Sequence, residues 1–136
     1  MRYDLLVRRY QLGVPVWRAL GGVTEIEPDG LRHVAANDRT AIVIDVREKD
    51  LFAKGTIANA RNIPRSGVLE EKDTGEVKLA KDDGRLPMDD HNTRLIVIGS
   101  DIATARYVAE ALTREAFHNV AYCHGSFDEA NAALRR

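Results

Sequence analysis

The stretch Leu95–Arg106 reads LIVIGSDIATAR, and it is the clearest indication of the fold in the sequence. Its first four residues are apolar, too few for a helix and rich in β-branched side chains, which is typical of a buried parallel strand. From Ile102 onward the apolar residues follow a helical spacing. The stretch therefore predicts a buried strand, a loop over Gly99–Thr104 and a helix. In such an arrangement the free N–H groups of the first helical turn can hold an anion.

Short apolar strands alternate with helical segments along most of the chain. This alternation is typical of an α/β fold whose parallel sheet is covered on both faces. We therefore expect a three-layer α/β/α sandwich with a sheet of about five strands. Further strands are expected within 23–26, 41–44, 60–63 and 117–123, and further helices over 28–37, 49–54 and, after a capping box at 126–129, through 134.

Residues 66–90 show no clear period. Charged side chains crowd this segment, and Gly75 and Gly84 are its turn points. A solvated hairpin or loose excursion is the favoured interpretation. The alternative is a partner-recognition flap, because long loops in compact domains are often functional.

The first 22 residues contain two short apolar turns, interrupted by Gly13 and Pro15. We expect residues 1–22 to form a helical arm that packs on the domain through Trp17, and residues 23–136 to form the domain itself. In the alternative interpretation Trp17 anchors a partner.

Composition excludes several classes of function. The 136 residues carry a net charge of −1, which gives no electrostatic reason to expect nucleic acid or an anionic membrane as a partner. No apolar run has the length of a membrane span, and the N-terminus lacks the apolar core of a signal peptide, so a cytoplasmic protein is expected. The single Cys123 and four scattered histidines have no metal-ligand spacing, so neither a metal nor another cofactor is expected.

Two blocks of the sequence resemble the rhodanese family, and together they cover about Val23 to Leu134. One block is the strand, loop and helix of Leu95–Arg106. The other resembles the family pattern of a strand ending in Asp-Val-Arg-Glu, then a short helix, then Gly-His-Ile-x-x-Ala-x-Asn-Ile-Pro. Thr56 stands where the family usually has His. The matching residues are Asp45, Val46, Arg47, Glu48, Gly55, Ile57, Ala60, Asn62, Ile63 and Pro64.

The resemblance implies an active-site loop that begins with a sulfur-carrying Cys, and Gly99 stands at that position. It also implies cationic residues at the next two positions in members that use thiosulfate, whereas this chain has Ser100 and Asp101. The Asp101 carboxylate would repel a dianion. Both departures predict the absence of ordinary rhodanese catalysis. By the same resemblance, Asp45 and Arg47 tie the strand end to neighbouring loops.

Cys123 is the one remaining thiol, next to His124 at the end of the last strand. As a substitute nucleophile it would need His124 to lower its pKa. However, neighbouring residues in a strand point to opposite faces, so a small buried residue is the favoured interpretation.

The sequence therefore predicts a catalytically inactive rhodanese-like domain that acts as a binding or regulatory module. The strand ends at 45–47, 99–104 and 122–125 should converge on one crevice. Two alternatives stay open: an atypical sulfurtransferase that carries sulfur on Cys123, and a dimerisation or docking domain that uses the 1–22 arm. The expected partner is a protein or small molecule, and the expected state is a monomer or weak homodimer. The binding loop is predicted to comprise Gly99, Ser100, Asp101, Ile102, Ala103 and Thr104.

Overall fold

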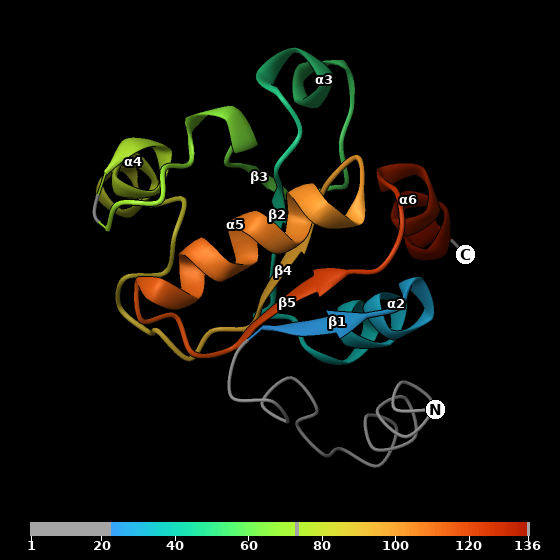
Figure 1. Ribbon diagram of the computed structural model, residues 1–136. Helices are drawn as coiled ribbons and strands as arrows, with labels where there is room; N and C mark the ends of the chain where they lie inside the picture. The colour runs from blue at the N-terminus through green and yellow to red at the C-terminus, as the bar shows by residue number, and fades with distance from the viewer. Residues whose placement is uncertain (1–22, 73, 136) are drawn as a thin grey trace.

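A computed structural model describes residues 23–72 and 74–135, which form a sheet of five parallel strands between two layers of helices (Figure 1). The strand order is β1-β5-β4-β2-β3. This arrangement confirms the expected α/β fold with a parallel sheet. The strands are β1 (Thr24–Ile26), β2 (Ile42–Asp45), β3 (Arg61–Asn62), β4 (Leu95–Ile98) and β5 (Val120–Cys123).

Strand β4 lies at the centre of the sheet, and all four of its residues are buried, as its apolar sequence predicts. Leu95 pairs with Ile42 of β2 and with Val120 of β5. Because all strands run parallel, their carboxyl ends meet at one edge of the sheet, which we call the carboxyl edge. The chain that leaves β4 therefore emerges at the middle of the carboxyl edge, between the ends of β5 and β2.

Two hydrophobic cores cover the two faces of the sheet. Helices α4 (Gly75–Asp83) and α5 (Ile102–Arg114) pack on one face, which we call the α5 face. Helices α2 (Pro28–Asn37) and α6 (Phe127–Arg135) pack on the other, the α6 face. The short helix α3 (Lys49–Lys54) buries none of its residues.

Local signals place the starts of α2 and α6 where the sequence predicts them. Pro28 is at the start of α2, where its missing N–H costs nothing. The capping box before α6 forms as expected: Ser126 N–H donates to Glu129 Oε1 at 2.8 Å, and Glu129 N–H donates to Ser126 Oγ at 3.2 Å.

The segment 66–90 is not the loose excursion that its charges predict. It begins within a 3₁₀ turn, η2 (Arg65–Gly67), and contains helix α4, which contributes Val77 and Ala80 to the core of the α5 face. Leu86 is buried in the same core. The solvated-hairpin interpretation was therefore wrong, because a few apolar residues among many charges suffice to fix the segment on the sheet.

The predicted arm, including Trp17, lies outside the described residues. Within 23–72 and 74–135, no helix is long and apolar enough to cross a membrane.

Candidate functional site

The connection between β4 and α5 is shorter than the predicted six-residue loop. Only Gly99, Ser100 and Asp101 link the two elements, and Ile102–Thr104 form the first turn of α5. Asp101 is extended, with φ −147° and ψ 168°, and its Oδ1 accepts a hydrogen bond from Thr104 N–H at 2.8 Å. It is therefore the N-cap that starts the helix early.

The carboxylate of Asp101 accepts hydrogen bonds from backbone N–H groups of the first turn of α5, which could otherwise bind an anion. Hydrogen bonds from Thr104 N–H, the Thr104 hydroxyl and Ala103 N–H lower its pKa below the usual value. The positive end of the helix dipole favours the same ionised form. The first turn of α5 is thus already capped by a charge of this chain.

Gly99 lies in a crowded position on the α5 face. A Cβ at this residue would stand 3.0 Å from Val46 Cγ2 and 3.3 Å from Ala105 N. Val46 is itself fully buried. The close approach of β2 and α5 therefore favours a residue without a side chain here.

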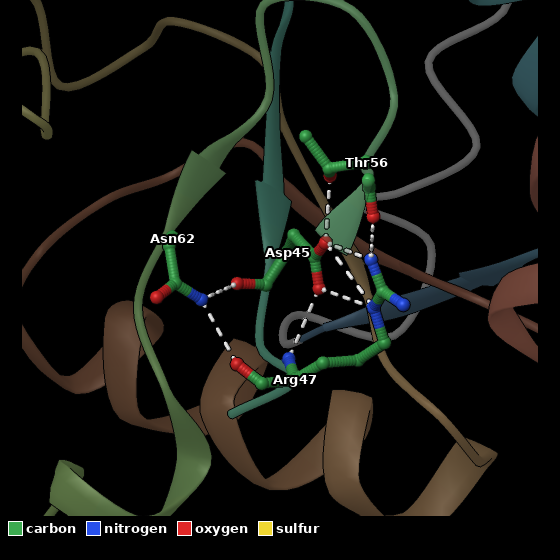
Figure 2. A network of polar contacts seen from close by, with 5 residues as sticks. Asp45, Arg47, Thr56 and Asn62 are labelled. Atoms are coloured by element: carbon green, nitrogen blue, oxygen red, sulfur yellow. Dashed lines mark hydrogen bonds and ion pairs between the residues drawn. The ribbon is translucent and has the colours of Figure 1, made fainter. Parts of the chain in front are cut away.

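A buried ion pair lies at the carboxyl end of β2 (Figure 2). The fully buried Asp45 carboxylate pairs with Arg47 Nη2 at 2.9 Å and also accepts from Arg47 N–H at 3.0 Å. The hydroxyl of Thr56 donates to the same carboxylate at 2.7 Å. Both oxygens of Asp45 are thus engaged inside the protein.

Arg47 and Asn62 extend this network to three neighbouring segments. Arg47 Nη2 donates to Gly55 O at 2.7 Å, and its guanidinium carbon lies 3.4 Å from the ring centroid of Phe127 in α6. Asn62 Nδ2 donates to the carbonyls of Asp45 and Arg47, both at 2.9 Å, which ties β3 to the end of β2 (Figure 2). The network fastens loops around the strand end, and its charges are neutralised internally.

Cys123 lies on the α6 face, whereas the position of a Gly99 side chain lies on the α5 face. The thiol is fully buried in the core that contains Ile26, Phe127 and Ala130. Burial, together with the nearby negative charges of Glu27 and Glu129, raises its pKa to about 12. The thiolate that sulfur chemistry requires is therefore disfavoured at neutral pH.

His124 does not approach the thiol, as the alternation of the strand predicts. Its Nδ1 instead pairs with Glu25 Oε2, while the Tyr122 hydroxyl donates to Glu25 Oε1 at 3.1 Å. Sequence reasoning missed Glu25. No local signal could identify it, because only the pairing of β1 with β5 brings Glu25 opposite Tyr122.

The three strand ends meet at the carboxyl edge, but their side chains separate onto the two faces. Val46 N–H donates to Ile98 O at 2.9 Å, and Val97 of β4 pairs with Tyr122 of β5, so the three backbones are adjacent. Asp45, Arg47 and Cys123 belong to the α6 face, and Asp101 and His124 do not join them. The single crevice expected from the sequence is therefore divided by the sheet.

Two cavities are lined by residues other than those of the β4–α5 connection. One of about 400 Å³ is bounded by α3, η2 and Glu76. Another of about 630 Å³ lies at the opposite, amino edge of the sheet, against Thr40, Ile42 and Thr93. Among residues 23–72 and 74–135, no three His, Cys, Asp or Glu side chains are grouped so as to hold a metal ion.

The family model of the rhodanese-like domain matches residues 29–133. No curated protein matches the sequence. Among solved structures, the chain is similar to a single-domain sulfurtransferase of Saccharomyces cerevisiae, with 19% identity, a TM-score of 0.61 and coverage of 83% of this chain and 92% of that one. A rhodanese-like domain protein of Staphylococcus aureus gives 17% identity, a TM-score of 0.59 and coverage of 79% and 91%. The rhodanese-like domain of an Anabaena protein gives 16% identity, a TM-score of 0.63 and coverage of 79% and 73%.

At these identities the solved structures establish the shared fold, and the family model, which spans most of the chain, establishes the family. The chain therefore belongs to the rhodanese-like domain family.

Proposed function

We propose that this chain is a rhodanese-like domain without sulfurtransferase activity, and that it acts as a binding or regulatory module. The observation that carries the proposal is the β4–α5 connection. By the family resemblance, its first residue would be the sulfur-carrying Cys, and here it is Gly99. Two donors of the first helical turn that could support a bound sulfur or anion, Thr104 N–H and Ala103 N–H, already bind the Asp101 carboxylate.

Sulfur transfer in this family needs a thiolate that accepts a sulfane sulfur and holds it as a persulfide. Gly99 offers no atom for that bond. The ionised Asp101 carboxylate, two residues further on, opposes the approach of thiosulfate. The missing nucleophile and the negative charge both support a domain without sulfurtransferase activity.

The rival function, an atypical sulfurtransferase that uses Cys123, has less support. Its thiol is fully buried and lies on the opposite face of the sheet from the β4–α5 connection. Its pKa, raised to about 12, leaves very little thiolate at neutral pH.

Intact-mass spectrometry tests the proposal after incubation with thiosulfate and, separately, with a low-molecular-weight persulfide. We expect no gain of a sulfur atom in the wild-type chain, and no cyanide-dependent formation of thiocyanate. A stable sulfur adduct that is lost in Cys123→Ser would overturn the proposal in favour of the rival enzyme. Turnover that survives Cys123→Ser would overturn both.

The variant Gly99→Cys restores one of the two features that thiosulfate-using members have and this chain lacks. Gly99→Cys restores a thiol at the first position of the connection but leaves the Asp101 carboxylate in place. We therefore expect no strong activity with thiosulfate in the single variant, because the carboxylate still opposes the dianion. Strong turnover in Gly99→Cys would show that the missing thiol alone accounts for the absence of activity.

A further inference from the structure

Arg65 and Tyr107 form a stacked pair on the α5 face. Arg65 is the first residue of η2, and Tyr107 lies in the second turn of α5. The guanidinium carbon of Arg65 lies 3.6 Å from the centroid of the Tyr107 ring, and both residues are half-buried. An aromatic ring attracts a cation over its face, so Tyr107 holds the guanidinium of Arg65 in one place. The N–H bonds of a stacked guanidinium lie in its own plane and can still donate to a ligand.

Arg65 differs from two other arginines at the carboxyl edge and on α5, because no carboxylate in the described part of the chain lies at ion-pair distance from its guanidinium. Arg47 is paired with Asp45, and Arg106 is paired with Glu110. Among residues 23–72 and 74–135, no carboxylate pairs with Arg65; its side chain contacts the ring of Tyr107. The guanidinium is thus held in position without a carboxylate of the described residues at ion-pair distance, and the nearby carboxylate of Glu48 accepts instead from the N–H and hydroxyl of Ser66.

The pair lies beside the β4–α5 connection. Arg65 N–H donates to Val46 O at 3.0 Å, and Val46 is the residue whose side chain crowds Gly99. Ligands of parallel α/β sheets bind at the carboxyl ends of the strands. Arg65 is therefore placed where this fold presents a ligand.

We infer that Arg65, held by Tyr107, is the binding group for an oxyanion, a carboxylate or a phosphate, at the carboxyl edge. This inference deepens the proposed binding function by naming the class of ligand, and it rests on that function. The guanidinium fork donates two parallel hydrogen bonds to such a group, and the stacked ring reduces the freedom lost on binding. Asp101 lies at the same end of α5, so its charge reduces the affinity for an anion.

Titration followed by ¹⁵N-resolved NMR tests the site on the full chain. Sodium succinate and inorganic phosphate are the two probes, each at constant ionic strength set by sodium chloride. We expect saturable shifts of the Arg65 side-chain Nε–H and of the backbone amides around Arg65 and Tyr107. The probe with the lower Kd identifies the preferred oxyanion. Absence of these shifts with both probes overturns the inference.

Matched variants assign any binding to this pair. Arg65→Gln should weaken the affinity by about tenfold or more, the effect of losing a charge-assisted hydrogen bond. Arg114→Gln removes the same charge at the exposed far end of α5, and its Kd should stay within about twofold of the wild-type value because the charge is screened at that distance. Equal losses in the two variants would reduce the effect to net charge and overturn the site. The amide spectrum of each variant reports whether it is folded.

Two further variants test the roles of the ring and of the opposing carboxylate. Tyr107→Phe keeps an aromatic face and should bind like wild type, whereas Tyr107→Leu removes the face and should bind more weakly. Asp101→Asn keeps a capping side chain but removes its charge, so it should bind the anion more tightly. A Tyr107→Leu chain that binds as well as wild type would show that the stack has no part in binding.

The inference and the proposed function can fail separately. Sulfur uptake with normal anion shifts would remove the non-catalytic proposal and keep the oxyanion site. Neither sulfur uptake nor anion shifts would remove the oxyanion site and leave the non-catalytic proposal standing.

Discussion

Gly99 connects two elements that approach each other closely. Any side chain at this residue meets the methyl group of Val46, whose Cγ2 would lie 3.0 Å from the added Cβ. Val46 is fully buried and packs in the core of the α5 face, so it has little room to yield. The absence of a side chain at Gly99 is thus consistent with the packing of its neighbours.

We predict that Gly99→Ala lowers the free energy of unfolding by about 1–2 kcal/mol through overpacking. Urea denaturation measures the change. The matched control is a double-mutant cycle with Val46→Ala, in which the added methyl group finds space. A cost of Gly99→Ala that is the same in both backgrounds would show that Val46 is not the source of the crowding.

Asp45 stabilises the end of β2 through its charge. Its carboxylate is fully buried and is paired with an Arg47 side chain that is 10% exposed. Removing one partner of a buried pair leaves the other charge without compensation. Asp45→Asn should therefore lower the free energy of unfolding by about 3 kcal/mol in urea denaturation.

Thr56→Val is the matched control for Asp45→Asn. It removes one hydrogen bond to the same carboxylate, and should cost about 1 kcal/mol because no charge is left unpaired. If Asp45→Asn were as mild as Thr56→Val, the ion pair would contribute little to the stability of this edge.

The role of a residue was predictable from the sequence only where its partner lies a few positions away in the chain. Asp101 three residues before Thr104, at the start of a helical pattern, is a capping signal that the sequence contains. The pairing of Glu25 with Tyr122 and His124 joins residues almost a hundred positions apart and depends on strand register. The stack of Arg65 on Tyr107 likewise depends on how η2 lies against α5.

The start of α5 depends on the ionised form of one side chain, that of Asp101. The folded pKa of Asp101 is lowered, mainly by Thr104 N–H. A lowered folded pKa means that the carboxylate stabilises the fold above the unfolded pKa of about 4, and that this stabilisation is lost as the pH falls through the folded value.

We predict that Asp101→Ala lowers the free energy of unfolding at neutral pH by about 1 kcal/mol, the usual cost of a lost N-cap. The difference from wild type should shrink as the pH is lowered below about 4, because the wild-type carboxyl then takes up a proton. Asp101→Asn is the control, since its capping group does not titrate. A difference between wild type and Asp101→Ala that is unchanged from pH 7 down to about pH 2 would refute the charge-based account.

Most elements were predictable because their local signals agree with their environment. β4 is a continuous apolar run, and α5 and α6 have both a periodic apolar face and a cap. Helix α4 was missed because it buries only Val77 and Ala80 among many charges. Its position is fixed by tertiary contacts, which a single sequence does not reveal.

The sheet separates the functional side chains of the carboxyl edge into two groups, one on each face. The α6 face contains Cys123 and the Asp45–Arg47 pair, whereas the α5 face contains Gly99, the Asp101 cap and the Arg65–Tyr107 stack. The Cys123 thiol on the α6 face cannot reach the β4–α5 connection on the α5 face without disruption of the strands between them. The division therefore links the proposed loss of sulfur chemistry to the topology of the fold.

Cys123 reports directly on this division, because its thiol is fully buried beneath α2 and α6. We predict that iodoacetamide labels it slowly in the native protein, at a rate set by the population of opened molecules. As urea is added, the labelled fraction should rise with the same midpoint as unfolding followed by far-UV circular dichroism. Rapid native labelling, well below that midpoint, would instead reveal an accessible thiol and strengthen the case for a nucleophile at Cys123. Burial also keeps the closed thiol protonated, with a pKa of about 12, so labelling should proceed only through opened molecules. Raising the pH to about 9 should therefore accelerate native labelling by about the same factor as labelling of unfolded chains, because the opened thiol has an ordinary pKa.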